Sequence, residues 1–434
     1  MPLSLGARVT LDAERPVAGG WMLARHDGQV VLVAGAIPGE RITARVTRVA
    51  RGTVYADTEE VVTASPDRRP GVEGRCGGSI LGHIDYARQV TLKAAIIEDA
   101  WRRIGRLSAP APLPVVSSHE RGYRSRARLH AYNGRLGFFR EGTHQLCDPA
   151  ATGQLSESTL AWVREAGAAL SADAARALVA VDLVENASGT ERACHLHVRS
   201  GAPPRMFESL ASGLTGLSVG TEAGADEESP GWPPDRGVVV VAGEPSVTDV
   251  IDLSRDSRPV HVSLRHGARS FFQGNRFLLG PLVQLVVDAA LDAAVLDLFA
   301  GSGLFGLALA ATGRAPVTMV EGDPVSGRDL TANAAASDAD VSVEQLSVES
   351  YLTRTRTGIS TWVVDPPRTG LSEAVRAAAL RDRPARIVYV SCDPATLARD
   401  ARALVQGGYE VRSLTGLDMF PSTAHVEAVC VLDG

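Results

Sequence analysis

Cys392 is the residue of this chain best placed for nucleophilic chemistry. It lies in Ser391-Cys392-Asp393-Pro394, between an apolar run at 387–390 that predicts a strand and a helical pattern at 395–404. A thiol at a strand end beside a helix N-terminus lies in a field that stabilises the thiolate, the form that attacks electrophiles. Cys194 and Cys430 lie within apolar strand patterns, so we expect them to be core residues.

A glycine turn is predicted to bind a nucleotide-like ligand. The run from Val295 to Gly303 reads as a buried strand that enters a turn, and a helix is expected over 304–311. Gly301 and Gly303 permit close backbone approach and unusual φ angles, and a helix N-terminus supplies free N–H groups. With Gly306 they match the GxGxxG pattern, which by itself is weak support for a dinucleotide site.

Two acids distinguish between the cofactors that this turn could bind. Asp297 lies four residues before the first glycine, and Glu321 follows the next predicted strand, 317–320. An acid at a strand end suits ribose hydroxyls, whereas a carboxylate ahead of the glycines opposes a pyrophosphate and suits a cationic amino-acid group. S-adenosylmethionine is therefore favoured over NAD, and a tight turn without a ligand is the alternative.

Two further polar motifs are expected near the same rim. The motif Asp365-Pro-Pro-Arg368 follows a predicted strand at 361–364, and doubly wound folds bind ligands outside the carboxyl ends of their strands. In His425-Val-Glu427 the alternation puts His425 and Glu427 on one face of a strand, where a carboxylate could accept a proton. An ordinary loop and surface strand residues are the alternative interpretations.

The elements that position these residues fall into three predicted domains. Short β-branched runs separated by glycine turns predict a small, OB-like β-barrel over 1–64. Strands with helices near 156–170 and 203–214 predict a central α+β domain over 65–268. In 269–434 apolar strands alternate with alanine-rich helices, which is typical of a doubly wound, mostly parallel α/β sheet. The acidic stretch 221–237, rich in Pro and Gly, is expected to be a surface loop.

Composition indicates a globular protein of the cytoplasm. The 434 residues are 45% hydrophobic and 22% charged, which excludes extensive disorder and a fibrous array. We find neither an apolar run that could cross a bilayer nor a signal peptide, so a cytoplasmic location is expected. Five scattered cysteines are too few for disulfide bonds to stabilise a chain of this length. Sulfur chemistry is therefore expected from individual thiols. A net charge of -6 argues against a protein that coats nucleic acid.

Five motifs, taken in chain order, resemble those of the RNA uridine C5-methyltransferases. They are Ser270–Asn275 (SFFQGN), Asp297–Gly303, Asp365–Arg368, Ser391–Arg399 and His425–Glu427. The barrel is similar to the TRAM domain that many of these enzymes carry, and Cys76-Gly-Gly-Ser79 resembles their cysteine-bearing segment. The resemblance covers nearly the whole chain. It implies a C-terminal class I methyltransferase domain, S-adenosylmethionine as cofactor, and RNA as substrate, with ribosomal RNA favoured over tRNA.

The resemblance also implies roles for individual residues. Cys392 is the implied nucleophile that adds to C6 of uracil, and Glu427 is the implied base that removes H5 after methyl transfer. The residues expected to surround S-adenosylmethionine are Gln273, Phe299, Glu321 and Asp365, beside Gly301 and Gly303 of the turn.

Contacts with RNA are expected from the SFFQGN motif and from the middle of the chain. A reactive uracil must be flipped out or presented in a loop, and Phe272 is the candidate to stack on it. Arg124, Arg126 and Arg128 alternate as in a strand, which puts them on one face as a phosphate track despite the negative net charge. A solvated arginine face is the alternative. We expect a monomer without a membrane partner.

The chain departs from those relatives in which four cysteines hold an iron–sulfur cluster. Only Cys76 and Cys147 remain of that pattern, and Ser79 stands where another thiol is expected. Because two ligands cannot hold the usual cluster, we expect neither a cluster nor another metal.

Three alternative functions remain. An RNA cytosine C5-methyltransferase also uses a cysteine adduct and S-adenosylmethionine, but such enzymes usually carry a cysteine directly after a proline in the loop that here reads Asp365-Pro-Pro-Arg368. The second alternative is a non-catalytic RNA-binding protein with this fold. The third is an NAD-dependent oxidoreductase.

Overall fold

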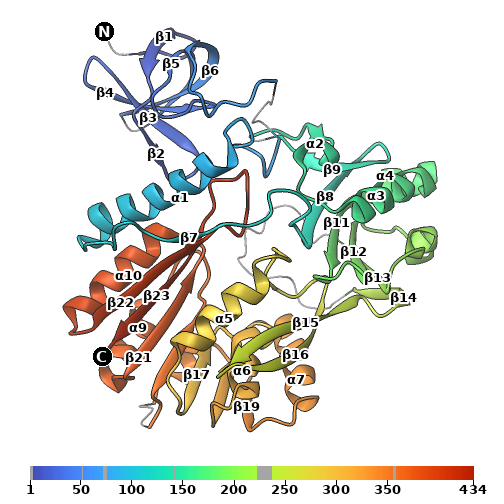
Figure 1. Cartoon of the computed structure of the whole chain (residues 1–434). Helices are drawn as coiled ribbons and strands as arrows, with labels where there is room; N and C mark the ends of the chain where they lie inside the picture. Colours follow the sequence, from blue (N-terminus) through green and yellow to red (C-terminus); the bar gives the residue numbers. More distant parts are fainter. Residues whose placement is uncertain (1–2, 51, 72–75, 141, 222–236, 355–357) are drawn as a thin grey trace.

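A computed structural model describes residues 3–50, 52–71, 76–140, 142–221, 237–354 and 358–434. An N-terminal β domain, a central sheet and a C-terminal α/β domain follow one another from blue to red in Figure 1. The acidic stretch predicted as a surface loop lies, apart from its end residues, outside the described residues. Among the helices that the structure describes, none has the length and apolar composition that a bilayer crossing requires.

A six-stranded sheet forms the N-terminal domain, in the order β1-β5-β6-β4-β3-β2. Buried and exposed residues alternate along its first strand, so that Val9 and Leu11 face the core. The strands are β1 (Arg8–Asp12), β2 (Arg15–Val17), β3 (Trp21–His26), β4 (Gln29–Ala34), β5 (Arg41–Ala50) and β6 (Thr53–Thr63). The predicted small β domain is confirmed.

A seven-stranded sheet with helices on one face forms the middle of the chain, in the order β10-β9-β8-β11-β12-β13-β14. Its strands are β8 (Arg126–Tyr132), β9 (Arg135–Phe139), β10 (Leu146–Cys147), β11 (Leu178–Glu185), β12 (Arg192–Val198), β13 (Gly216–Thr221) and β14 (Val239–Gly243). The helices are α2 (Pro149–Thr152), α3 (Glu157–Ala169), α4 (Ala172–Ala177) and the 3-10 helix η2 (Pro204–Ala211). The helix predicted near 203–214 is therefore shorter and tighter than expected, because it begins at two consecutive prolines and ends before Gly213.

The C-terminal domain is the predicted doubly wound fold, built on an eight-stranded sheet in the order β19-β18-β17-β20-β21-β23-β22-β7. Its strands include β17 (Val295–Leu298), β18 (Val317–Val320), β19 (Val341–Glu344), β20 (Thr361–Val364), β21 (Arg386–Ser391), β22 (Glu410–Leu417) and β23 (Glu427–Asp433). Its helices are α5 (Leu279–Ala289), α6 (Leu304–Ala311), α7 (Pro324–Ala335), α8 (Val348–Tyr351), α9 (Glu373–Asp382) and α10 (Pro394–Gln406). The strands from β19 to β21 are parallel, and β23 runs antiparallel to β21.

Two segments that the sequence assigned to the central domain pack against the C-terminal domain instead. The first comprises α1 (Tyr86–Ala100), the π-helical turn η1 (Trp101–Gly105) and β7 (Val115–Val116), which adds the last strand to the eight-stranded sheet. The second is the hairpin of β15 (Ser246–Arg255) and β16 (Arg258–Gly267), whose Ile251 and Leu264 enter the same core as α5 and α6. We therefore place 86–116 and 246–268 with the C-terminal domain.

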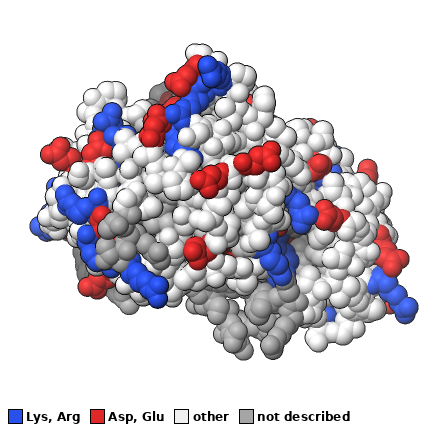
Figure 2. All heavy atoms as spheres, turned by 90° about the horizontal axis from the view of Figure 1, so that it is seen from below, with Lys and Arg blue, Asp and Glu red and all other residues white. Residues whose placement is uncertain are grey.

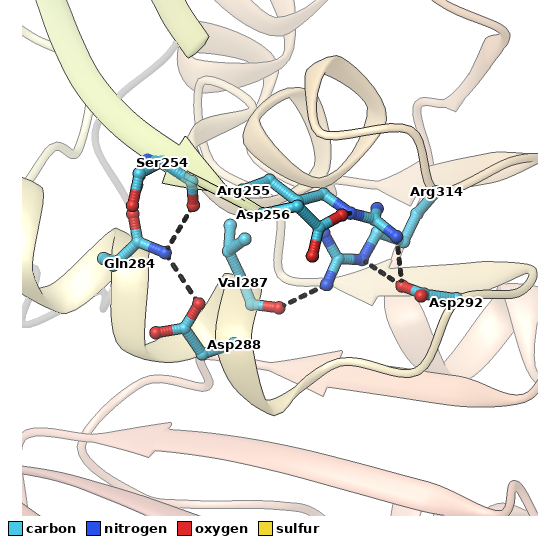
Figure 3. Close-up of a pocket in the computed structure, with 8 residues that line it drawn as sticks. All are labelled: Ser254, Arg255, Asp256, Gln284, Val287, Asp288, Asp292 and Arg314. Atoms are coloured by element: carbon cyan, nitrogen blue, oxygen red, sulfur yellow. Dashed lines mark hydrogen bonds and ion pairs between the residues drawn. The ribbon is translucent and has the colours of Figure 1, made fainter. Parts of the chain in front are cut away.

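The pocket drawn in Figure 3 lies at the amino-terminal edge of this sheet, before β17 and β18 begin. Arg314, which is 6% exposed, donates a hydrogen bond of 2.7 Å to the Val287 carbonyl, and Arg255 pairs with Asp292 at 2.7 Å. Because its arginines are engaged by carbonyl groups and by Asp292, this pocket ties the β15–β16 hairpin to α5 and to the loop after α6.

Candidate functional site

The carboxyl ends of four neighbouring parallel strands carry the predicted site residues. β18, β17, β20 and β21 lie side by side, and Glu321, Phe299, Asp365 and Cys392 follow them. Because parallel strands end at one edge of a sheet, these residues gather there. Glu427 reaches the same edge as the first residue of β23, which runs in the opposite direction beside β21.

The backbone of the turn after β17 requires its glycines. Gly301 and Gly303 have φ angles of 57° and 94°, in the left-handed region. A Cβ atom on Gly303 would also lie 2.9 Å from the side chains of Leu307 and Leu330. Glu321, at the end of β18, fixes the turn by accepting a hydrogen bond of 2.7 Å from the Gly301 amide.

Phe299, the first residue of this turn, has a φ angle of 64°. A bulky residue rarely adopts this conformation, and such strained positions gather at functional sites. The partly exposed ring also packs against the core on one side of the sheet. The residue was predicted from the resemblance, but its strained backbone has no signature in the sequence.

Asp297 lies beneath the glycine turn. Its side chain is fully buried, and its Oδ2 accepts a hydrogen bond of 2.8 Å from the Gly306 amide. Burial raises the pKa of Asp297 to about 8, with smaller contributions from Asp365 and Glu321. This carboxyl group therefore holds the start of α6 through one oxygen, and its expected role toward a cationic group stays a prediction.

Asp297, Asp365 and Glu321 lie close enough together at this rim that the charge of Glu321 raises the pKa of the other two groups. Burial raises the pKa of Asp365 to about 7, and the charge of Glu321 adds to this effect. Burial likewise raises the pKa of Glu321. Gln273, 6% exposed, donates a hydrogen bond of 3.4 Å to Asp365 Oδ2. These acceptors and their mutual repulsion fit a cofactor that carries hydroxyl groups and positive charge, as S-adenosylmethionine does.

Cys392 and Glu427 lie at adjacent ends of two antiparallel strands. Ser391, the last residue of β21, pairs with Ala428, so Cys392 and Glu427 each stand next to this last pair of the ladder. Burial, together with the charges of Glu427 and Asp365, raises the pKa of the Cys392 thiol to about 11, and the nearby Arg368 opposes this shift. Burial also raises the pKa of Glu427, again with Asp365 adding and Arg368 opposing.

The helix after Cys392 does not favour the thiolate in the way that the sequence suggested. Asp393 caps α10 by accepting hydrogen bonds from the amides of Ala395 and Thr396, at 2.8 and 2.9 Å. The positive end of the helix is therefore occupied by a carboxylate, whose charge raises the pKa of Cys392. Arg368, to which the sequence assigned no role, is the neighbouring cation that favours the thiolate.

Alkylation of Cys392 by iodoacetamide is expected to be slow at neutral pH and to accelerate about tenfold per unit between about pH 7 and pH 10, because only the thiolate reacts. Among the free cysteines that the structure describes, Cys392 is partly exposed, whereas Cys194 and Cys430 are buried. Mass spectrometry of the labelled peptides measures the rate, and Cys392→Ser is the matched blank. A rate that reaches a plateau below about pH 8 would contradict the raised pKa.

Buried polar contacts anchor the loop that leads into Glu427. Lys93 on α1 and Asp418 form an ion pair in which both side chains are 0% exposed. Asn275, the last residue of the SFFQGN motif, donates a hydrogen bond of 3.0 Å to the Met419 carbonyl. Because an unpaired buried charge is costly, these contacts hold the loop, and with it Glu427, in one position.

Phe272 is not placed to stack on a substrate base. It is 5% exposed and lies within the core, where its ring stacks on His266 with 3.7 Å between the ring centroids. Phe271 has the opposite orientation and is 61% exposed. The prediction for Phe272 is therefore wrong, because the two neighbouring phenylalanines face opposite sides of the segment and the sequence does not say which side is buried.

The three predicted RNA-binding arginines are engaged within the protein. Arg126 donates to the carbonyl groups of Gly267 and Ala268, at 3.2 and 3.1 Å, and so links β8 to the end of β16. Arg124 and Arg128 also make contacts within the protein, described below. The prediction of an RNA contact is wrong for Arg126, whose guanidinium is used structurally, and for the other two it stays a prediction.

Side-chain partners account for the positions of these two arginines. Arg124 donates a hydrogen bond of 2.6 Å to Gln154, and Arg128 pairs with Asp182 at 2.8 Å. On the face seen in Figure 2, basic and acidic side chains are likewise interspersed over the part that the structure describes. A continuous arginine track is therefore absent from the described part of β8.

Cys76 and Cys147 are joined by a disulfide bond that the sequence did not predict. Their Cα atoms are 5.9 Å apart, and the bond ties the segment after the N-terminal domain to β10. The expectation of individual thiols is wrong for this pair, because 70 residues separate two cysteines that the fold brings together. Within the described ranges, no group of three or more His, Cys, Asp and Glu side chains is arranged to hold a metal ion.

Two family models match parts of the chain. The model described as tRNA (Uracil-5-)-methyltransferase matches residues 325–433, which contain Asp365, Cys392 and Glu427. The TRAM domain model matches residues 6–58, which form most of the N-terminal β domain.

Two similar curated proteins align with almost the whole chain. The 23S rRNA (uracil(1939)-C(5))-methyltransferase RlmD of Methylococcus capsulatus is 31% identical, and the alignment covers 99% of each chain. The protein of the same name from Pseudomonas putida is 32% identical, over 99% of this chain and 94% of its own.

Among solved structures, the tRNA (uracil-54, C5)-methyltransferase of Pyrococcus abyssi has a similar fold, with a TM-score of 0.74. The superposition covers 97% of this chain and 100% of that chain at 24% sequence identity. That crystal structure was determined in complex with S-adenosyl-L-homocysteine.

Proposed function

The chain belongs to the RNA (uracil-C5)-methyltransferases, and from this premise we propose that it methylates C5 of a uridine in ribosomal RNA through a covalent adduct with Cys392. The observation that supports the proposal is the last pair of the β21–β23 ladder, Ser391 with Ala428, because Cys392 and Glu427 are the next residues beyond it, at the rim that also holds the glycine turn. A nucleophile and a base at one edge are the two groups that this reaction needs.

S-adenosylmethionine, when bound, supplies the electrophilic methyl group. The partly buried carboxylates of Glu321 and Asp365 would accept hydrogen bonds from it, and Gln273, held by its contact with Asp365, would line the same space. The Phe299 ring and the Gly301 backbone would bound the site on the side of the turn.

Cys392 activates the uracil. C5 is a poor nucleophile until a group adds at C6, so the thiolate forms a bond to C6 and the electron pair of the C5–C6 double bond moves into an enolate. That enolate can form a bond from C5 to the methyl carbon. Arg368 is the cation that favours the reactive thiolate against the acidic groups around it.

Glu427 completes the reaction by removing a proton. After transfer, C5 carries both the methyl group and H5; loss of H5 lets the electron pair re-form the double bond, and the sulfur leaves C6. The pKa of Glu427, raised by burial, suits a carboxylate that must accept a proton from carbon. Because Glu427 lies close to Cys392, it is near C5, the carbon next to the C6 that the thiolate attacks.

Ribosomal RNA is the proposed substrate class because the two relatives above are named for uracil 1939 of 23S rRNA. Mass-spectrometric mapping of RNA from cells that lack the protein tests this. We expect one ribosomal 5-methyluridine to disappear, and to return with the wild-type chain but not with Cys392→Ala. Loss of 5-methyluridine from tRNA alone would reject the substrate class, and loss of 5-methylcytidine would reject uridine as the target.

A further inference from the structure

The central sheet leaves part of one face uncovered. On β8 and β9, Leu129 and Phe138 point into the core formed with α3, α4 and η2. Side chains alternate along a strand, so His130, Tyr132 and Phe139 point to the other face. In Figure 1, α3 and α4 lie to one side of these strands. We call this group, with His144 from the following loop, the ring platform.

The members of the ring platform are flat side chains in contact with one another. His130 stacks on Phe139 with 3.7 Å between the ring centroids and 11° between the planes. His144 meets the edge of Phe139 at 5.3 Å. Tyr132 is 68% exposed at the end of β8. Gly137 lies opposite His130 in the register, so no side chain separates these rings.

The chemistry of the ring platform suits nucleobases. Burial lowers the pKa of His130, with the charge of Arg128 adding to the effect, so that its imidazole is neutral at neutral pH. Stacked neutral rings offer a face to any base, and aromatic residues on an open sheet are a common way to bind unpaired RNA. Arg135 is exposed and pairs with Tyr132 in the register, which places a cation beside the rings for a phosphate group.

Strand β8 connects the ring platform to the proposed catalytic edge. At its start, the Ser125 amide donates a hydrogen bond of 2.9 Å to the Gly274 carbonyl, directly after Gln273. Tyr132 lies seven residues after Ser125 along extended chain, which corresponds to about 23 Å. An RNA strand that leaves the catalytic edge along β8 therefore meets the rings within a few nucleotides.

We propose that the ring platform of His130, Tyr132, Phe139 and His144 binds unpaired nucleobases that flank the target uridine. The proposal rests on the proposed function in that RNA is the substrate. It assigns a task to the central domain, which holds neither Cys392 nor the glycine turn. The exposed Arg135 beside the rings favours a polyanion such as RNA as the occupant of this surface.

Binding of a fluorescein-labelled single-stranded oligouridylate of about 15 nucleotides tests the proposal by fluorescence anisotropy. We expect Tyr132→Ala to raise the dissociation constant about tenfold, since stacking on one aromatic residue contributes that much. Tyr132→Phe keeps the ring and should bind as the wild type does. Val250→Ala, at an exposed site on β15, is the matched control away from the platform. Equal affinity of Tyr132→Ala and wild type would overturn the proposal.

Cross-linking of the unaltered chain gives a second measurement that does not depend on variants. Ultraviolet irradiation with the same oligonucleotide carrying 5-bromouridine should label peptides from 126–144. Labels found only outside this range would reject the platform. In methylation assays, Tyr132→Ala should raise KM with little change in kcat, as expected for a residue that binds substrate away from the reacting atoms.

The binding measurements need no methyl transfer, so the two proposals fail separately. If binding of the oligonucleotide depends on Tyr132 but no RNA is methylated at uridine, the ring platform is supported and the proposed function is rejected. If uridine is methylated while Tyr132→Ala leaves both the dissociation constant and KM unchanged, the proposed function stands and the ring platform falls.

Discussion

Replacement of Cys392 by alanine is expected to reduce methyl transfer to uridine by about 10⁴-fold or more, since loss of a covalent nucleophile leaves only binding and positioning. The side chain is partly exposed and directly follows the last residue of β21, so the smaller residue opens no large cavity in the core. RNA affinity and thermal unfolding should stay close to those of the wild type. Single-turnover transfer of a labelled methyl group measures the loss.

Trapping the adduct between Cys392 and RNA tests the same role of Cys392 by the formation of a product instead of by a loss of activity. RNA with 5-fluorouridine at the target position, incubated with the methyl donor, carries no H5, so the methylated adduct formed by Cys392 cannot be resolved by proton removal. We expect a denaturation-resistant protein–RNA species with wild type and none with Cys392→Ala. Cys430→Ala is the matched cysteine control, because Cys430 is 0% exposed in the core of β23, and it should trap RNA as wild type does. An active wild-type preparation that never yields the species would refute the covalent mechanism.

Replacement of Glu427 by glutamine is expected to slow turnover by about 10²- to 10⁴-fold, which is the usual contribution of a positioned general base. Glutamine has nearly the same shape but cannot accept H5, so the reaction should stop after methyl transfer. The methylated adduct with Cys392 should therefore accumulate on ordinary uridine RNA. Denaturing electrophoresis with a labelled methyl donor detects it.

The thiol of the Glu427→Gln variant provides a control for its folding. Because the charge of Glu427 raises the pKa of Cys392, its removal should lower that pKa and speed alkylation by iodoacetamide at alkaline pH. A misfolded site would not combine faster alkylation with an accumulated adduct. Rapid turnover in the variant would show that another group removes H5.

The sequence was sufficient for features that depend on neighbouring residues. Apolar runs followed by glycine or polar residues identify the strands before Phe299, Glu321, Asp365 and Cys392. Alternation of strand and helix makes the sheet parallel, so these strand ends must meet at one edge. The predicted strand at 317–320 and the helix at 304–311 agree with the structure to the residue.

Other features depend on residues that are distant in the sequence. Arg126 finds its acceptors about 140 positions away, in the segment after β16. The pairing of Cys76 with Cys147 and the addition of β7 to the C-terminal sheet are also long-range contacts. A pattern of residue types determines which side chains can be buried, but not which distant segment buries them.

Cys392 and Glu427 show which features the sequence determines and which depend on the tertiary structure. The sequence alone determined that a thiol ends one strand and that a carboxylate lies near the start of another, because local hydrophobic patterns set strand boundaries. Only the tertiary structure decided that β23 inserts antiparallel between β21 and β22, which brings the start of β23, with Glu427, to the end of β21, where Cys392 follows. That choice follows from the packing of complete strands against both layers of helices, and no short stretch of sequence contains it.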